Sequence, residues 1–185
     1  MRKILPIVLC FPLAAFAAPP ASAPPAKSPP AVSVAACDVQ LNVIDPDPKG
    51  LNVRSGPTAS APVVDVIRDD GDWSSVHVTG QQGDWMAIDR AETIDDRLSE
   101  GVRSALKRPG WVHVSRLGVS ELATGSGTVL RDRPSRDGKV LSRIRPDDSA
   151  PTRILGCQGT FIHVRHGTQT GWTDTWCNDE RTTCA

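Results

Sequence analysis

The sequence predicts an all-β protein in which two small β-barrels follow each other along the chain. Two observations lead to this fold class. Short apolar runs rich in valine and isoleucine are separated by turns of Gly, Pro and Asp, which is typical of barrels and sandwiches. The same pattern then returns further along the chain at an offset of 77 residues, which indicates an internal duplication.

Residues 1–17 have the features of a cleavable secretory signal. Arg2 and Lys3 give a positive start, residues 4–14 are apolar, and small residues at 15 and 17 predict cleavage near Ala17. A spanning helix needs roughly 20 apolar residues, and no stretch of this chain is that long. We therefore predict a periplasmic or secreted protein without a transmembrane segment.

Residues 18–36 are rich in proline and alanine. They contain Pro19, Pro20, Pro24, Pro25, Pro29 and Pro30. Because proline lacks an amide donor and fixes its own φ, this stretch is expected to be an extended, semi-rigid tether.

The charge of the chain is balanced, with 21 Lys and Arg against 21 Asp and Glu. Loss of Arg2 and Lys3 with the signal leaves 19 against 21, a net charge near −2. This balance gives no electrostatic reason to expect a nucleic-acid partner or an anionic membrane surface.

Four cysteines follow the signal, namely Cys37, Cys157, Cys177 and Cys184. An even number in an exported chain predicts two disulfides, and the cysteines lack the C-x₂-C spacing that is typical of zinc sites. Three pairings are compatible with the sequence. We favour Cys177 with Cys184, which closes a short polar loop, and Cys37 with Cys157, which closes a long one.

The duplication divides the rest of the chain. Residues 50–70 align without gaps on 127–147, and two further blocks follow in the same order. The matched turn and strand residues include Gly50, Arg54, Pro57, Val63, Ile67, Gly80, Gly83, Trp85 and Trp111, which meet Gly127, Arg131, Pro134, Val140, Ile144, Gly156, Gly159, Phe161 and Trp172. We therefore predict a first domain over residues 37–119 and a second over 120–185, whose tail is closed by cysteines.

The first copy carries an insertion at residues 89–109. Within it Ile94, Leu98, Val102 and Ala105 recur at helical spacing, and Pro109 follows. This pattern predicts an amphipathic helix over 92–106. Its apolar face either packs on its own barrel or binds a partner.

Three segments carry a resemblance to a known family. Residues 51–57 (LNVRSGP), 83–88 (GDWMAI) and 110–113 (GWVH) resemble the opening, central and closing strands of the bacterial SH3-type domain family. The second copy departs further, because residues 129–134 (VLRDRP) lack the glycine and Phe161 replaces the tryptophan. The resemblance implies tandem SH3-like barrels, the first with the helical insertion.

The resemblance also implies a non-catalytic binding protein whose ligand comes from the cell wall, either a peptidoglycan peptide or a glycan. The family's ligand groove lies beside an outward aromatic on the central strand, which makes Trp85 the first binding candidate, followed by Trp111, Trp73 and Phe161. The alternative is that these rings seal the barrel edge or the contact between the two copies. An envelope protein bound through the helix 92–106 is the alternative partner.

The sequence offers little for catalysis, metals or cofactors. Cys157 near His163 and His166 is the nearest approach to a nucleophile with a base, and a disulfide would remove its thiolate. His77 and His113 complete a scattered set of histidines without the spacing of a metal motif. We therefore expect no enzyme activity, no metal and no cofactor.

Overall fold

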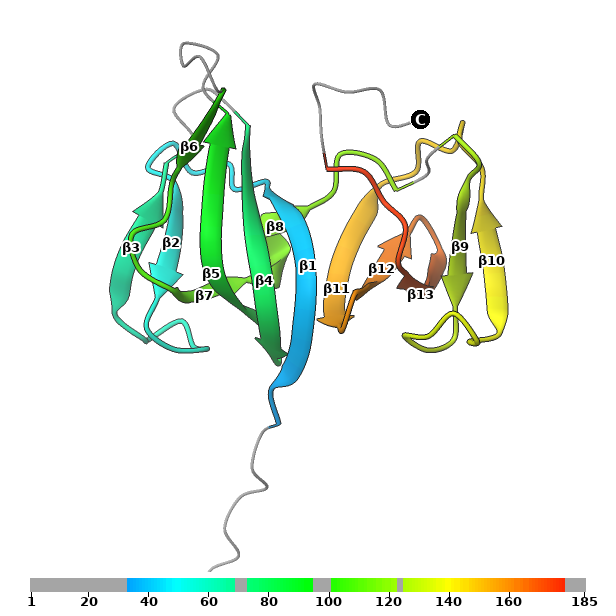
Figure 1. Ribbon diagram of the computed structural model, residues 1–185, viewed down its shortest axis with the longest axis horizontal. Coiled ribbons are helices and arrows are strands. Elements are labelled where there is room, and N and C mark those ends of the chain that lie inside the picture. Colours follow the sequence, from blue (N-terminus) through cyan, green and yellow to red (C-terminus); the bar gives the residue numbers. More distant parts are fainter. Residues whose placement is uncertain (1–32, 69–72, 95–100, 123–124, 179–185) are drawn as a thin grey trace, which may run out of the picture. The chain divides into compact units, whose positions relative to one another are not determined.

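Two antiparallel β-sheets make up the part of the chain that the structure describes (Figure 1). The computed structural model describes residues 33–68, 73–94, 101–122 and 125–178. The predicted signal and residues 18–32 of the predicted tether lie outside these ranges. Within them every regular element is a strand except one 3₁₀ turn, so the all-β prediction is confirmed.

The first sheet has eight strands. They are β1 (Ala35–Val43), β2 (Leu51–Arg54), β3 (Val63–Ile67), β4 (Ser74–Gln82), β5 (Trp85–Ile94), β6 (Val102–Ser104), β7 (Gly110–His113) and β8 (Leu117–Gly118). Their hydrogen-bonded order is β3-β2-β7-β5-β4-β1-β8, and β6 pairs with β5. The 3₁₀ turn η1 (Val114–Arg116) joins β7 to β8.

The second sheet has five strands. They are β9 (Thr128–Arg131), β10 (Val140–Ile144), β11 (Thr152–Gln158), β12 (Phe161–His166) and β13 (Gln169–Thr173), in the order β10-β9-β13-β12-β11. This order repeats the path β3-β2-β7-β5-β4 of the first sheet. The sequence repeat is therefore also a repeat of strand topology.

Matching glycines sit at matching turns of the two sheets. Gly50 and Gly127 precede β2 and β9 with φ of 92° and 79°. A Cβ on Gly127 would lie 2.6 Å from the carbonyl oxygen of Ile144, and one on Gly50 would meet that of Ile67 in the same way. Only glycine combines this φ with so close a backbone approach.

The two sheets also share a hairpin type. Gly83 begins the two-residue turn between β4 and β5, and Gly159 begins the one between β11 and β12. Their φ angles are 58° and 56°, and among the described residues only glycines have a positive φ. Glycine at the first central position is the mark of a type II′ turn, whose twist matches that of antiparallel strands. The turn residues of the sequence thus fix the registers of both hairpins.

The prediction of closed barrels is wrong. Within the described ranges β3 does not pair with β4 or β8, and β10 does not pair with β11, so both sheets are open. In the first sheet β1 takes the edge of β4 that closure would need. In the second sheet that edge belongs to β11, which is tied to β1 through a disulfide.

The predicted helix over 92–106 is also wrong. Residues 92–94 end β5 and pair antiparallel with residues 102–104 of β6, with Ile94 opposite Val102. Leu98 lies outside the described residues. Thr93 is buried and its hydroxyl lies 2.7 Å from that of Ser74 on β4, so the sheet satisfies it. Sheet pairing and β-branched residues prevail over the helical spacing.

One hydrophobic core cluster draws on both sheets. It contains buried residues of the first, such as Leu41 and Ile88, and of the second, such as Ile144 and Ile162. The described residues of both sheets accordingly belong to one compact unit. No helix among the described residues is long and apolar enough to cross a membrane.

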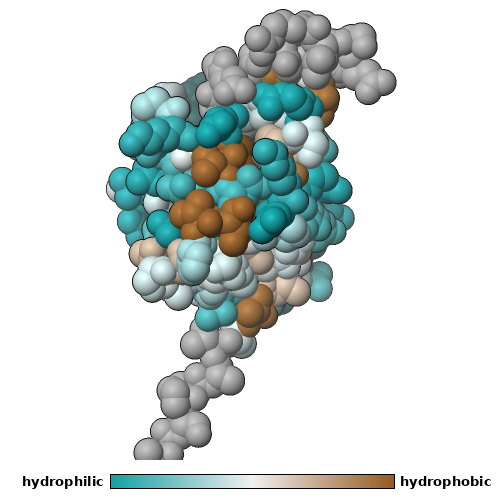
Figure 2. All heavy atoms as spheres, turned by 90° about the vertical axis from the view of Figure 1, so that its left-hand side faces the viewer, coloured by the Kyte–Doolittle hydropathy of each residue, from teal (hydrophilic) through white to brown (hydrophobic). Residues whose placement is uncertain are grey.

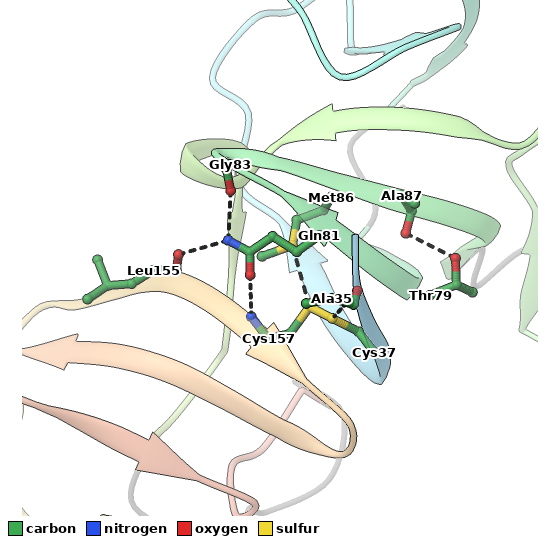
Figure 3. The surroundings of a disulfide bond; sticks show 9 residues. All are labelled: Ala35, Cys37, Thr79, Gln81, Gly83, Met86, Ala87, Leu155 and Cys157. Atoms are coloured by element: carbon green, nitrogen blue, oxygen red, sulfur yellow. Dashed lines mark hydrogen bonds between the residues drawn. A yellow bond between two sulfur atoms is a disulfide. The ribbon is translucent and has the colours of Figure 1, made fainter. Parts of the chain in front are cut away.

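A disulfide and one glutamine link the sheets (Figure 3). Cys37 of β1 is bonded to Cys157 of β11 with 5.8 Å between their Cα atoms, which confirms the favoured pairing. Gln81 accepts a hydrogen bond from Cys157 N (2.7 Å) and donates one to Leu155 O (3.3 Å). Cys177 is disulfide-bonded as well, and Cys184 lies outside the described residues.

Candidate ligand-binding surface

The outer face of β5 and β7 carries two tryptophans and a histidine. Successive side chains of a strand point to opposite faces. On β5 the side chain of Met86 is buried in the core, whereas that of its neighbour Trp85 is half-buried on the other face. Trp85 is opposite His113 of β7, and Ala87 is opposite Trp111. We call these four residues the Trp85 surface.

Trp85 and His113 pack edge to face. Their ring centroids lie 5.3 Å apart and their planes meet at 88°, a preferred arrangement for aromatic pairs. His113 is held in place because its Nδ1 accepts from Ser115 N (3.3 Å) at the start of η1. The imidazole thereby orients the indole while leaving it half-exposed.

Trp111 lies beside an arginine of β2. Arg54 is its register partner, and the guanidinium Nη1 donates to Ala61 O (2.8 Å) in the turn before β3. The second sheet repeats this arrangement, with Arg131 opposite Trp172 and Nη1 donating to Gly138 O (2.9 Å). In both copies the arginine holds the turn in place next to a half-buried tryptophan.

Phe161 is buried, with 8% of its surface exposed, and takes no part in an outward face. The half-buried aromatic pair of the second sheet consists instead of His163 on β12 and Trp172 on β13, opposite each other in register. Their rings stack with centroids 4.7 Å apart and planes 16° from parallel. Burial lowers the pKa of His163, which favours its neutral form at physiological pH.

Trp73 lies at the other end of the β4–β5 hairpin from Trp85. Gln82 pairs with Trp85, whereas Ser74, next to Trp73, pairs with Thr93. At about 3.3 Å per residue these ends are roughly 25 Å apart. The amide of Asn42 is oriented so that both its oxygen and its nitrogen have hydrogen-bond partners. In this orientation Trp73 Nε1 donates to the amide oxygen of Asn42 at 3.0 Å. Trp73 thus ties β4 to β1 and does not join the Trp85 surface.

A histidine between two carboxylates lies on β4. His77 Nε2 is 2.9 Å from Asp38 Oδ1, and Nδ1 is 2.7 Å from Asp89 Oδ1. The hydrogen bonds that the imidazole donates to these carboxylates, the one to Asp38 first, raise the pKa of His77. Sequence reasoning missed this cluster because Asp38, His77 and Asp89 are brought together by the registers of three strands.

The thiol of Cys157 is not free, because its sulfur is bonded to Cys37, and it also lies 3.6 Å from the sulfur of Met86. No group of three or more His, Cys, Asp or Glu suited to a metal ion occurs within residues 33–68, 73–94, 101–122 and 125–178. The chemistry that the described surface offers is aromatic stacking and hydrogen bonding. Comparisons with protein-family models, curated proteins and solved structures find no match for this chain.

Proposed function

We propose that this chain is an exported, non-catalytic binding protein made of two SH3-type modules, and that its Trp85 surface binds a cell-wall ligand, a peptidoglycan peptide or glycan. The observation that carries the proposal is the half-buried indole of Trp85, fixed edge to face on His113 at 5.3 Å. An aromatic ring held in advance loses little conformational freedom when a ligand stacks on it.

One further observation supports a ligand at this place, and another is compatible with export. Trp111 follows on the same face, so that two indoles and an imidazole lie on neighbouring strands. Such a surface suits sugar rings and peptide groups, which combine apolar faces with hydrogen-bonding edges. The buried disulfide between Cys37 and Cys157 is compatible with an oxidising compartment outside the cytoplasm.

The test is sedimentation of the purified protein with isolated cell-wall sacculi, comparing wild type with Trp85→Ala. We expect the variant to bind about tenfold more weakly, since a central aromatic contact contributes about 1–2 kcal/mol. Leu141→Ala is the matched control, because it truncates an apolar side chain of β10 that is 51% exposed and lies outside the Trp85 surface. Equal sedimentation of wild type and Trp85→Ala, or of neither, would contradict the proposal.

A protein partner is the second candidate, and an apolar face favours it. Figure 2 looks onto the side where β3 lies and shows apolar residues gathered among polar ones. β3 ends the sheet with an edge free of strand pairing in the described ranges, and Val63 on it is 45% exposed. Unpaired apolar edges are places where another chain adds a strand.

Val63→Lys distinguishes this candidate from the first. A lysine on an edge strand opposes strand addition without affecting the core. Loss of a co-purifying protein, with sacculus binding unchanged, would favour the protein partner. Unchanged co-purification would exclude this edge as the interface.

A further inference from the structure

Two arginines lie directly opposite each other on the outer face of the second sheet. Arg153 of β11 is the register partner of Arg165 of β12, and both residues are exposed. Directly opposite residues of antiparallel strands have Cα atoms roughly 4.5–5.5 Å apart, and like charges in this position destabilise a sheet. The pair therefore lowers stability, and the proposed function does not use it.

No carboxylate of the described residues neutralises the two guanidinium groups. Neither group forms an ion pair or a side-chain hydrogen bond within the described ranges. The acidic residue nearest to Arg153 along the chain is Asp148, which lies 3.1 Å from His166 Nε2. His166 is buried, and its side chain points to the opposite face of β12 from that of Arg165, because neighbours on a strand alternate. Both positive charges are thus available to an anion from outside the chain.

A hydroxyl group and two aromatic rings lie beside this pair. Thr170 of β13 is exposed and is the register partner of Arg165, so it continues the row onto a third strand. His163 and Trp172 form the next row of the same face, two positions away along the same two strands. Their half-buried rings stack with centroids 4.7 Å apart. We call these five residues, Arg153 included, the Arg153 surface.

The charge of the Arg153 surface comes from its arginines. Burial lowers the pKa of His163, so its imidazole is neutral at physiological pH. Guanidinium groups bind carboxylates through charge-assisted hydrogen bonds, often two at a time. A hydroxyl and aromatic rings next to them suit rings that combine an apolar face with hydrogen-bonding edges. Sugars that carry carboxylate groups have both properties.

The place of these residues within the sheet disfavours an extended peptide. Peptides that bind to sheets commonly add a strand at an open edge. β12 and β13 lie inside the five-stranded sheet, so their backbone groups are already paired with neighbouring strands. Arg165 and Thr170 therefore offer a ligand their side chains alone.

We propose that the Arg153 surface binds an acidic polysaccharide, that is, a chain of sugars with carboxylate groups. A carboxylate lies between the guanidinium groups of Arg153 and Arg165. The sugar ring that carries it covers Thr170 and the exposed part of the Trp172 ring. The Arg153 surface shares no residue with the Trp85 surface, so either proposal can fail without the other.

The first experiment is calorimetric titration of the purified protein with oligomers of galacturonic acid. Methyl-esterified oligomers of the same length are the comparison ligand, because they keep the sugar rings and lose the charge. Poly-glutamate presents the same carboxylates without sugar rings. The titrations use about 0.15 M salt, which screens attraction between distant exposed charges. We expect the galacturonate oligomers to bind about tenfold more tightly than either comparison ligand, or better.

The second experiment repeats the titration with variants. Arg153→Gln/Arg165→Gln removes both charges from the surface, and we expect it to bind galacturonate oligomers about tenfold more weakly or worse. Arg68→Gln/Arg108→Gln removes two charges from exposed arginines of the first sheet and should bind as wild type does. Because the paired arginines repel each other, Arg153→Gln/Arg165→Gln should be at least as stable as wild type in urea.

Several results would overturn the inference. One is a wild-type protein that does not bind galacturonate oligomers or binds their methyl esters equally well. Equal binding of poly-glutamate would replace the polysaccharide by an acidic peptide. Equal affinity in wild type and Arg153→Gln/Arg165→Gln, or the same loss in Arg68→Gln/Arg108→Gln, would exclude this surface as the site. A clear loss of stability in Arg153→Gln/Arg165→Gln would show that the pair has a structural role instead. The wild-type titrations decide the matter even if a variant fails to fold.

Discussion

Gln81 and Gly156 act as a pair at the contact between the two sheets. A Cβ on Gly156 would lie 2.6 Å from Gln81 Oε1, so glycine leaves the room that the amide needs. The same amide donates to Gly83 O at 2.8 Å, which ties it to its own hairpin. A single side chain thus satisfies polar backbone groups from both sheets. Among these groups the backbone N–H of the buried Cys157 requires such a partner.

His77 gives the clearest pH dependence at this scale. Its pKa is raised by Asp38 and Asp89, so its stabilising effect is complete below the ordinary histidine pKa of about 6.5 and is lost as the pH rises through the higher folded-state value. We expect the stability difference between wild type and His77→Gln to be about 0.2–1 kcal/mol near pH 6 and to shrink towards pH 8.5.

Urea denaturation at several pH values measures this difference. All pH values used in the denaturation experiments lie above about 5, where an ordinary aspartate remains ionised. In a background carrying Asp38→Asn and Asp89→Asn, the pH dependence of the difference should disappear. A difference that grows with pH would contradict the assigned ion pairs.

At the scale of elements, the segment after β5 shows how a periodic pattern can mislead. Ile94, Val102 and Ala105 are spaced as on a helix face. In the sheet, however, Ile94 pairs with Val102, and Ala105 N donates to Ala91 O at 2.9 Å. Gly101 precedes β6 with φ of 64°. Antiparallel pairing between the end of β5 and β6 determined the conformation of this segment.

Gly101→Ala tests this conformation by the sign of its effect. In a helix, alanine would stabilise the protein by about 0.5–1 kcal/mol relative to glycine. At positive φ, alanine should instead destabilise it by about 1 kcal/mol. Thermal and urea unfolding measure the change. Gly56→Ala, where the nearest atom to a new Cβ is 3.7 Å away, should stay within about 0.5 kcal/mol of wild type.

At the scale of the whole molecule, the two copies depend on each other. The core cluster includes residues of both sheets, and Asp38 N donates to Gly159 O at 2.8 Å beside the disulfide. Trp176, after β13, donates through Nε1 to Gln40 O of β1 at 3.1 Å. A shared core predicts that both sheets unfold in one cooperative transition.

Removal of the linking disulfide should weaken both sheets together. Cys37 and Cys157 are 120 residues apart, and closing so long a loop contributes about 4–5 kcal/mol on the chain-entropy model. We expect the variant Cys37→Ala/Cys157→Ala to lose about that much, with coincident transitions by circular dichroism and tryptophan fluorescence. The double variant leaves Cys177 untouched, which a reducing agent would not. A loss below about 1 kcal/mol, or two separate transitions, would contradict this view.

The sequence by itself determined the all-β class, the repeat and the presence of turns at glycines such as Gly83 and Gly159, because valine-rich runs and turn glycines are local signals. It also favoured the pairing of Cys37 with Cys157. Only the tertiary structure decided that β1 takes the edge of β4 and keeps the first sheet open. Likewise only strand register brought Trp85 to His113 and His163 to Trp172. The physical reason is that strand pairing joins residues far apart in sequence, and no local pattern records the partner.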